Sequence, residues 1–153
     1  MDLVVAEAVD LALLDALAVD LAAVELDAGY DVLEKRRLSA DKIEIKPRSL
    51  KVKGKDVVLI DDIISTGGTL AEAIRVLKNE GARTVIAACA HPVLVENAFT
   101  RIYEAGADSL VSTDTIPSPV SLVSVAGLIA RALERSQAQQ SLRRYSDGDP
   151  NKG

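Results

Sequence analysis

One stretch, residues 57–69, constrains the fold of this chain more than any other. It begins with four apolar residues (57–60), continues with two acids, Asp61 and Asp62, and ends in a small polar segment with two glycines (65–69). The β-branched apolar run predicts a strand that is buried on both faces of a sheet. Because glycine adopts positive φ at little cost, the small polar segment predicts a tight turn.

The pattern after this turn is helical. Leu70, Ile74 and Leu77 are spaced to share one face of a helix that begins near Thr69. A strand, a glycine turn and a helix N-terminus together direct N–H groups and a positive dipole end at one point, which suits a phosphate dianion. The candidate phosphate-binding residues are Ser65, Thr66, Gly67, Gly68 and Thr69.

The two acids need a separate role, because carboxylates beside a phosphate repel it. Accepting hydrogen bonds from sugar hydroxyls is the role that carboxylates fill naturally. The sequence therefore predicts a ribose-phosphate site, with Asp61 and Asp62 on the sugar. The alternative is that Asp-Asp and Gly-Gly only form an ordinary turn between a strand and a helix, as in any α/β protein.

The rest of the chain alternates between strand and helix patterns. The predicted strands are 3–6, 30–33, 57–60, 84–90 and 109–112, and the predicted helices are a segment after Asp10, 69–80, 94–104 and 120–134. Pro47 excludes a central strand, so 34–55 is expected to be a flexible basic loop or hairpin. Alternating elements predict a three-layer α/β domain over 1–135 with a mostly parallel sheet of about five strands. A polar tail is expected over 136–153.

Composition excludes several classes of protein. The chain has 153 residues, enough for one core, and its net charge of −5 argues against a nucleic-acid partner. The lone Cys89 excludes an internal disulfide and fits a reducing cytoplasm, where a small buried thiol is expected. Because there is no 18-residue apolar run and no basic leader pattern, we expect neither a membrane span nor a signal peptide.

The opening segment, residues 2–28, contains only five residue types: Ala, Asp, Glu, Leu and Val. It still has an apolar helical stripe from Leu13 to Val24. Acids recur at every fifth position, a step that turns a helix by about 140°. They therefore do not share a face, and no metal site is predicted. So narrow an alphabet suggests a simplified or engineered segment.

Four parts of the sequence resemble one known family. Residues 57–69 resemble the phosphoribosyl-diphosphate (PRPP) motif of type I phosphoribosyltransferases and of ribose-phosphate diphosphokinases (PRPP synthetases). Residues 30–39, with Lys35-Arg36-Arg37, resemble the strand and flexible catalytic loop of PRPP synthetases. Residues 88–94 and 113–117 resemble the second half of an archaeal-type PRPP synthetase.

The resemblance implies a type I phosphoribosyltransferase-like fold and a reaction. The reaction is transfer of a diphosphoryl group from ATP to ribose 5-phosphate, with Mg²⁺, giving PRPP and AMP. Lys35 and Arg37 would stabilise charge on the phosphoryl oxygens, as mobile cations do in such transition states. His91 is not expected to take the family's nucleotide-binding role and is interpreted as a histidine satisfied by its surroundings.

Two departures from the family pattern limit the expected activity. The chain matches one of the two similar domains of a synthetase, and residues 7–10 lack the glycine of the family's diphosphate loop. We therefore expect weak binding of ribose 5-phosphate or PRPP, with little or no activity alone. Open alternatives are a homo-oligomer that rebuilds the enzyme, a non-catalytic partner of a full-length synthetase, and an engineered chain without selected activity. A phosphoribosyltransferase is disfavoured, since no base-binding hood segment is present.

Overall fold

The computed structural model describes residues 3–7, 24–25, 27–37, 43–47 and 51–146. The structure describes the backbone alone, without the side chains, for residues 7, 30–37, 43–47 and 138–146. The chain divides into two compact units, residues 1–123 and residues 124–153. Among the described residues, no helix is both long enough and apolar enough to cross a membrane.

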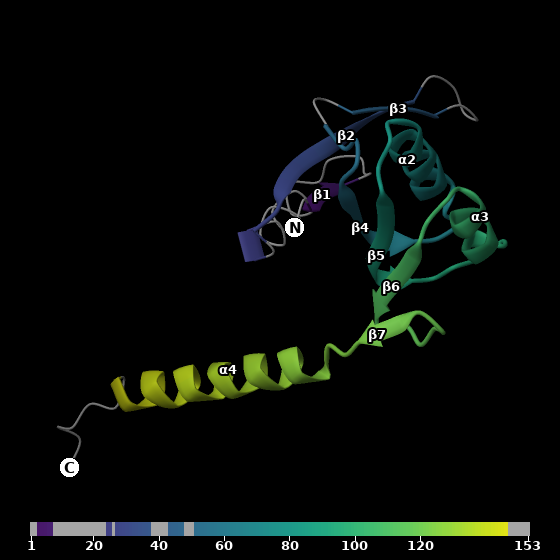
Figure 1. The fold of residues 1–153 in the computed structure, drawn as a ribbon. Helices are drawn as coiled ribbons and strands as arrows, with labels where there is room; N and C mark the ends of the chain where they lie inside the picture. Colours follow the sequence, from purple (N-terminus) through teal and green to yellow (C-terminus); the bar gives the residue numbers. More distant parts are fainter. Residues whose placement is uncertain (1–2, 8–23, 26, 38–42, 48–50, 147–153) are drawn as a thin grey trace, which may run out of the picture. The chain divides into compact units, whose positions relative to one another are not determined.

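The first unit is built on a seven-stranded sheet with the strand order β3-β2-β1-β4-β5-β6-β7 (Figure 1). All neighbouring strands are parallel except β2 and β3, which are antiparallel. The strands are β1 (Leu3–Glu7), β2 (Gly29–Arg37), β3 (Ile43–Pro47), β4 (Asp56–Ile64), β5 (Thr84–Pro92), β6 (Ser109–Thr113) and β7 (Ser121–Val123).

The predicted α/β class and the mostly parallel sheet are confirmed. The five predicted strands correspond to β1, β2, β4, β5 and β6, and the two additional strands, β3 and β7, lie at the edges. Pro47 ends β3 at one edge, where the missing N–H of proline costs no ladder bond.

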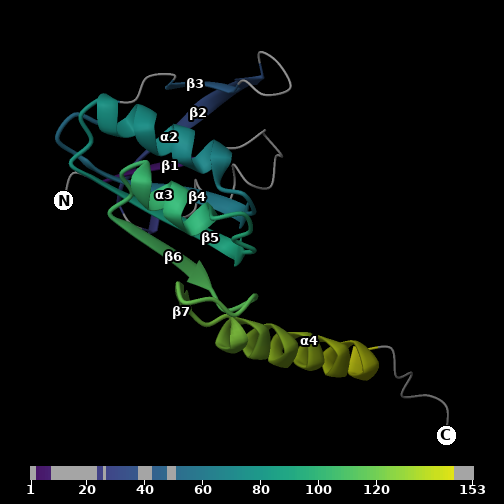
Figure 2. The ribbon, with the colours of Figure 1, turned by 90° about the vertical axis from the view of Figure 1, so that its right-hand side faces the viewer.

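The helices α2 (Gly68–Asn79) and α3 (Ala98–Glu104) cover one face of this sheet, as both ribbon views show (Figures 1 and 2). Their apolar sides meet alternate residues of the strands, so that Val57 and Leu59 of β4 are fully buried with Ile74 and Leu77 of α2. On the other face, Val58 and Ile60 of β4 are half-buried, while Val5 of β1, which pairs with Val58, is fully buried. The helix predicted after Asp10 lies largely outside the described residues.

The opening strand β1 lies in the middle of the sheet, between β2 and β4. Its residues Leu3 to Ala6 are buried, as the predicted strand requires. Because parallel strands end in the same direction, Glu7 pairs with Ile60 just before the two acids of β4. The five-letter segment therefore contributes directly to the frame behind the predicted site.

The segment expected to be a loop over 34–55 is partly regular structure. Strand β2 continues to Arg37, and residues 43–47 return beside it as β3. In this hairpin Lys35 is opposite Ile45 and Arg37 is opposite Ile43. The backbone ladder of an antiparallel pair therefore extends four residues beyond the strand predicted at 30–33, because hydrogen bonding to β3 compensates for the polar side chains.

The helix predicted at 94–104 begins four residues later, at Ala98. Leu94, Glu96 and Asn97 have φ values of 47°, 53° and 61°, which no right-handed helix accommodates. Apolar periodicity reports which residues face the core, but it does not report this local left-handed backbone.

The helix predicted at 120–134 is confirmed only from Ala126 on, as α4 (Ala126–Ser146) of the second unit, whereas Ser121–Val123 form the strand β7. Ser121 explains the first difference: its Oγ accepts from the Ser118 N–H and donates to the Ile116 carbonyl, both at 3.1 Å, which favours a turn into an edge strand. The helix continues through part of the tail expected over 136–153, because Gln, Ala, Leu and Arg are good helix formers.

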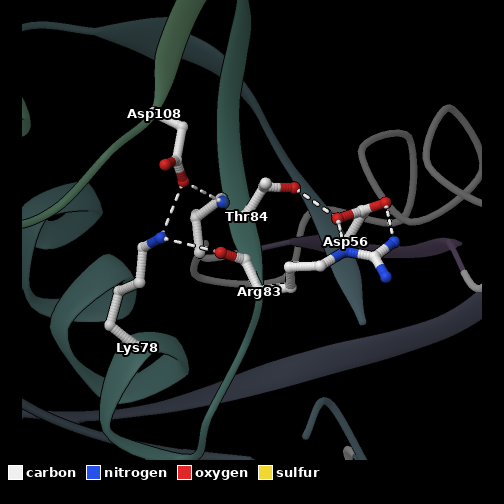
Figure 3. Close-up of polar contacts among 6 residues, drawn as sticks. Asp56, Lys78, Arg83, Thr84 and Asp108 are labelled. Atoms are coloured by element: carbon white, nitrogen blue, oxygen red, sulfur yellow. Dashed lines mark hydrogen bonds and ion pairs between the residues drawn. The ribbon is translucent and has the colours of Figure 1, made fainter. Parts of the chain in front are cut away.

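Two clusters of charged groups tie the amino ends of β4, β5 and β6 together (Figure 3). Arg83 donates to both carboxylate oxygens of Asp56, which also accepts from the Thr84 hydroxyl at 2.7 Å. The Asp108 carboxylate accepts from Lys78 Nζ at 2.7 Å and from the Val85 N–H at 2.6 Å. These contacts lower the pKa of Asp56 to about 2, chiefly through Arg83, and also lower that of Asp108, chiefly through Lys78.

The first prediction concerns Asp56 and pH. A lowered folded-state pKa means that Asp56 stabilises the fold above its unfolded pKa of about 4, and that this contribution is lost as pH falls toward 2. Asp56→Asn should therefore remove part of the decline in unfolding free energy between pH 4 and 2, measured by denaturant unfolding. Glu72→Gln, which changes an exposed helix pair with Arg75, is the control and should keep the wild-type slope. An unchanged slope in Asp56→Asn would contradict the assignment.

Candidate functional site

A small cavity lies at the carboxyl end of β4, where the chain turns into α2. Its volume is about 140 Å³. It is lined by Asp61, Ile63, Ile64, Ser65, Thr66, Gly67, Gly68, Thr69 and Leu70. The structure thus brings together all five predicted phosphate-binding residues and one of the two acids. Asp62 is exposed and is not part of this lining.

The turn beneath this cavity depends on Gly67. Its φ is +69°, and it directly precedes the first residue of α2, Gly68. A Cβ at this position would lie 3.2 Å from two side-chain carbons of Ile102 and 3.4 Å from the Ala98 Cβ. Glycine at this position therefore allows both the left-handed backbone and the close approach of α3.

The turn presents backbone donors that no described residue of the protein uses. Among the described residues, none accepts a hydrogen bond from the N–H groups of Ser65, Thr66 or Gly67. The first turn of α2 has no side-chain cap and no acidic residue, so the positive end of its dipole is not neutralised there. Together these groups form a site suited to an anion.

The acid pair has unusual electrostatics. Burial, followed by the hydrogen bond and negative charge of Asp62, raises the pKa of Asp61 to about 7. The Asp62 Oδ1 accepts from the Ile63 N–H at 2.6 Å. Asp61 can therefore exchange a proton near neutral pH, which a solvated carboxyl group does not do.

The predicted catalytic residues Lys35 and Arg37 lie on the β2–β3 hairpin. The described structure gives their backbone positions, while their side chains lie outside the description. Their predicted contact with phosphoryl oxygens therefore stays a prediction.

Two other residues considered in the sequence take structural positions beside the site. His91 Nδ1 lies 2.8 Å from Thr115 Oγ1, which donates to the Ala90 carbonyl at 2.7 Å, in keeping with a histidine satisfied by its surroundings. Cys89 is buried, and burial, with smaller effects from Asp61 and Asp62, raises the pKa of its thiol to about 11. A thiol of this kind is a packing group and not a nucleophile.

Sequence reasoning missed Arg101, which lies on α3. Its guanidinium donates to the carbonyl of Thr66, inside the predicted phosphate-binding segment, and to the carbonyl of Glu96 at 3.4 Å. It also lines a wider polar cleft of about 760 Å³ between α2 and α3. No sequence pattern marks a side chain that acts on a backbone carbonyl 35 positions away.

A metal ion would find few protein ligands here. Within the described ranges, no group of three or more His, Cys, Asp or Glu side chains is placed to hold one. The Asp61–Asp62 pair provides two carboxylates, which matches the way Mg²⁺ is commonly held by one or two carboxylates together with phosphate oxygens of a substrate.

Comparison with known sequences gives a consistent result. The model of the phosphoribosyl transferase domain matches residues 11–124. The ribose-phosphate pyrophosphokinase of Methanopyrus kandleri is 51% identical over 105 residues, which are 69% of this chain and 36% of that protein. That of Methanosarcina acetivorans is 52% identical over 106 residues, 69% of this chain and 38% of that protein. The chain thus spans well under half the length of these relatives.

Comparison with solved structures agrees. The phosphoribosylpyrophosphate synthetase from Mycobacterium smegmatis superimposes with a TM-score of 0.69 at 29% identity, over 90% of this chain and 46% of that one. An adenine phosphoribosyl transferase from Trypanosoma brucei, solved with AMP, pyrophosphate and ribose-5-phosphate, has the same fold at a TM-score of 0.54 and 16% identity, over 80% of this chain and 60% of that one. The family match over most of the chain, on a fold with these neighbours, means that the chain belongs to the phosphoribosyl transferase domain family.

Proposed function

We propose that this domain binds ribose 5-phosphate or PRPP in the cavity at the end of β4. The observation that carries the proposal is the bend at Gly67, which leaves the N–H groups of Ser65, Thr66 and Gly67 without acceptors among the described residues. In this proposal the 5-phosphate accepts from these groups, with the hydroxyls of Ser65, Thr66 and Thr69 as further donors.

The ribose would lie toward the acid pair. Asp61 lines the same cavity as the donors, and Asp62 follows it at the exposed end of β4. An ionised carboxylate accepts hydrogen bonds from two sugar hydroxyls, whereas a second phosphate there would be repelled. The pair therefore orients the ligand with its phosphate at α2 and its sugar at β4.

For a full-length enzyme that contains this domain, we propose the reaction that the names of the relatives indicate, which is diphosphoryl transfer from ATP to ribose 5-phosphate. Lys35 and Arg37 on the β2–β3 hairpin would stabilise charge on the phosphoryl oxygens. Mg²⁺, held by phosphate oxygens and the acid pair, would neutralise part of that charge when bound. Because the chain corresponds to 36% of the length of its Methanopyrus relative, we propose little or no catalysis by this chain alone.

The second prediction tests the phosphate site with a matched pair of glycines. Gly67 and Gly54 have similar φ values, +69° and +74°, but a Cβ at Gly54 would touch none of the described residues. Both Gly67→Ala and Gly54→Ala should lose stability from the left-handed backbone, by about 1–2 kcal/mol. Gly67→Ala alone should also weaken binding of ribose 5-phosphate, followed by NMR through the amide signals of residues 65–69.

Two outcomes would reject the phosphate site. The first is the absence of amide shifts in the wild-type protein at millimolar ribose 5-phosphate. The second is equal affinity in the Gly67→Ala and Gly54→Ala variants, both folded, which would place the ligand elsewhere.

The third prediction uses the raised pKa of Asp61. Since burial holds the carboxyl protonated below about pH 7, and ionised Asp61 is the better acceptor for a sugar hydroxyl, affinity should rise with pH. Between pH 6 and 8 the Asp61 contribution is about tenfold for one linked proton. Calorimetry with ribose 5-phosphate should show this rise in the wild type and lose it in Asp61→Asn, where only titration of the ligand phosphate remains. Identical pH profiles would rule out Asp61 as a ligand.

The fourth prediction concerns turnover. With ATP, Mg²⁺ and ribose 5-phosphate, a coupled assay should detect no release of AMP above background at micromolar protein. Robust turnover at all concentrations would contradict the proposal of an inactive domain. Turnover that rises more steeply than the protein concentration would instead favour self-assembly of two copies into one active unit.

A further inference from the structure

Three consecutive carbonyls of the proposed phosphate site are held by one neighbouring segment, residues 94–101. Two of these bonds come from backbone N–H groups and the third comes from a side chain. The bonds run from the Leu94 N–H to the Ile64 carbonyl at 2.9 Å, from the Val95 N–H to the Ser65 carbonyl at 3.1 Å, and from the Arg101 guanidinium to the Thr66 carbonyl. Every donor approaches from the same part of the chain.

The geometry of the peptide bond gives this arrangement a consequence. In a planar trans peptide the C=O and the following N–H point in opposite directions, and no cis peptide occurs in the described chain. Holding the carbonyls of residues 64–66 therefore turns the N–H groups of residues 65–67 away from the 94–101 segment. Those N–H groups belong to the residues that line the proposed phosphate cavity, and no residue of 94–101 does.

We propose that Arg101 is a positioning residue for phosphate binding: by holding the Thr66 carbonyl, it points the Gly67 N–H at the ligand. The inference rests on the proposed function of the cavity. Arg101 lines the cleft between α2 and α3, which shares Gly68 with the cavity, but it does not line the cavity itself; it therefore acts from behind the phosphate site without touching the ligand.

The position of Thr66 makes a side-chain donor necessary. The strand ladder of β4 ends at Ile64, and α2 begins at Gly68. The Thr66–Gly67 peptide lies between them, where its orientation is fixed neither by a strand ladder nor by a helix. Its neighbours are held by backbone donors, whereas Arg101 alone among the described side chains donates to its carbonyl.

The backbone conformation of residues 94–97 indicates that contacts with the surrounding protein hold this segment in place. Leu94, Glu96 and Asn97 all have positive φ, which is uncommon for residues other than glycine and persists where surrounding contacts maintain it. The second contact of Arg101, to the Glu96 carbonyl at 3.4 Å, is one such contact. One guanidinium therefore joins this segment to the phosphate site.

The positive charge of Arg101 has an effect beyond orienting the Gly67 N–H. A cationic donor on the Thr66 carbonyl polarises that peptide, which makes the Gly67 N–H a stronger donor toward an anion on its other side. Lysine carries the same charge, but it lacks the planar fork that reaches two carbonyls at fixed angles. The two substitutions Arg101→Ala and Arg101→Lys therefore separate charge from geometry.

The experiment compares the wild type with Arg101→Ala, Arg101→Lys and a control, Arg75→Ala. Arg75 lines the same cleft and pairs with Glu72 at 3.3 Å on α2. For each protein, calorimetry gives the dissociation constant for ribose 5-phosphate, and residual dipolar couplings of the free protein give the direction of the Gly67 N–H bond.

We expect Arg101→Ala to weaken binding by about tenfold or more, the range of a lost charge-assisted hydrogen bond, and to change the Gly67 N–H direction. Arg101→Lys should recover only part of the affinity. Arg75→Ala should stay within about twofold of the wild type, with an unchanged coupling for Gly67. Should Arg101→Ala fail to fold, Arg101→Lys decides by the same two measurements.

Three results would overturn the inference: wild-type affinity and coupling in Arg101→Ala, full recovery by Arg101→Lys, or equal losses in the Arg101 and Arg75 variants. Failure of the proposed function is recognised separately, because the wild type would then bind no ribose 5-phosphate. In that case the Gly67 N–H direction still decides: a change in Arg101→Ala and none in Arg75→Ala supports the positioning role, and no change in either rejects it.

Discussion

The site depends on one backbone constraint, the left-handed glycine between the last strand residue and the first helix residue. At Gly67 the chain leaves β4 and enters α2 within three residues, too few for either element's hydrogen-bond pattern to continue. One side of the bend is then free to face a ligand. The other side packs so closely on Ile102 that a β-carbon there would lie only 3.2 Å from its side chain. The proposed phosphate binding and the packing of α3 therefore both depend on Gly67.

In the proposed site, a negative ligand and two carboxylates would share one edge of the sheet. Burial beside Asp62 raises the pKa of Asp61 to about 7, so near neutral pH the pair carries less than its full charge of two. Protonation of Asp61 would reduce the repulsion of an approaching phosphate, and the ionised fraction of Asp61 would then accept hydrogen bonds from the sugar. The raised pKa is therefore consistent with the division of the cavity into a phosphate end and a sugar end.

What the sequence predicted correctly is what local patterns determine. The turn at 65–68 and the helix after it follow from glycine and from apolar spacing, and the order of strands and helices fixes the α/β class. The start of α3, the edge strand β7 and the long β2–β3 hairpin depend on left-handed residues, serine hydrogen bonds and pairing between strands. Arg101 was missed for the same reason: its partners are backbone carbonyls, which every residue possesses.

The opening segment shows that a buried strand and a ligand-binding turn place different requirements on the sequence. A central parallel strand needs apolar side chains on both faces and a backbone ladder, and Leu3 to Ala6 meet both needs from a five-letter alphabet. A ligand-binding turn needs more, since each peptide must point in a given direction. At 64–67 that direction requires a glycine and three external donors, one of which is a guanidinium from another helix. A simplified sequence can therefore supply the frame of this domain far more easily than it can supply the site.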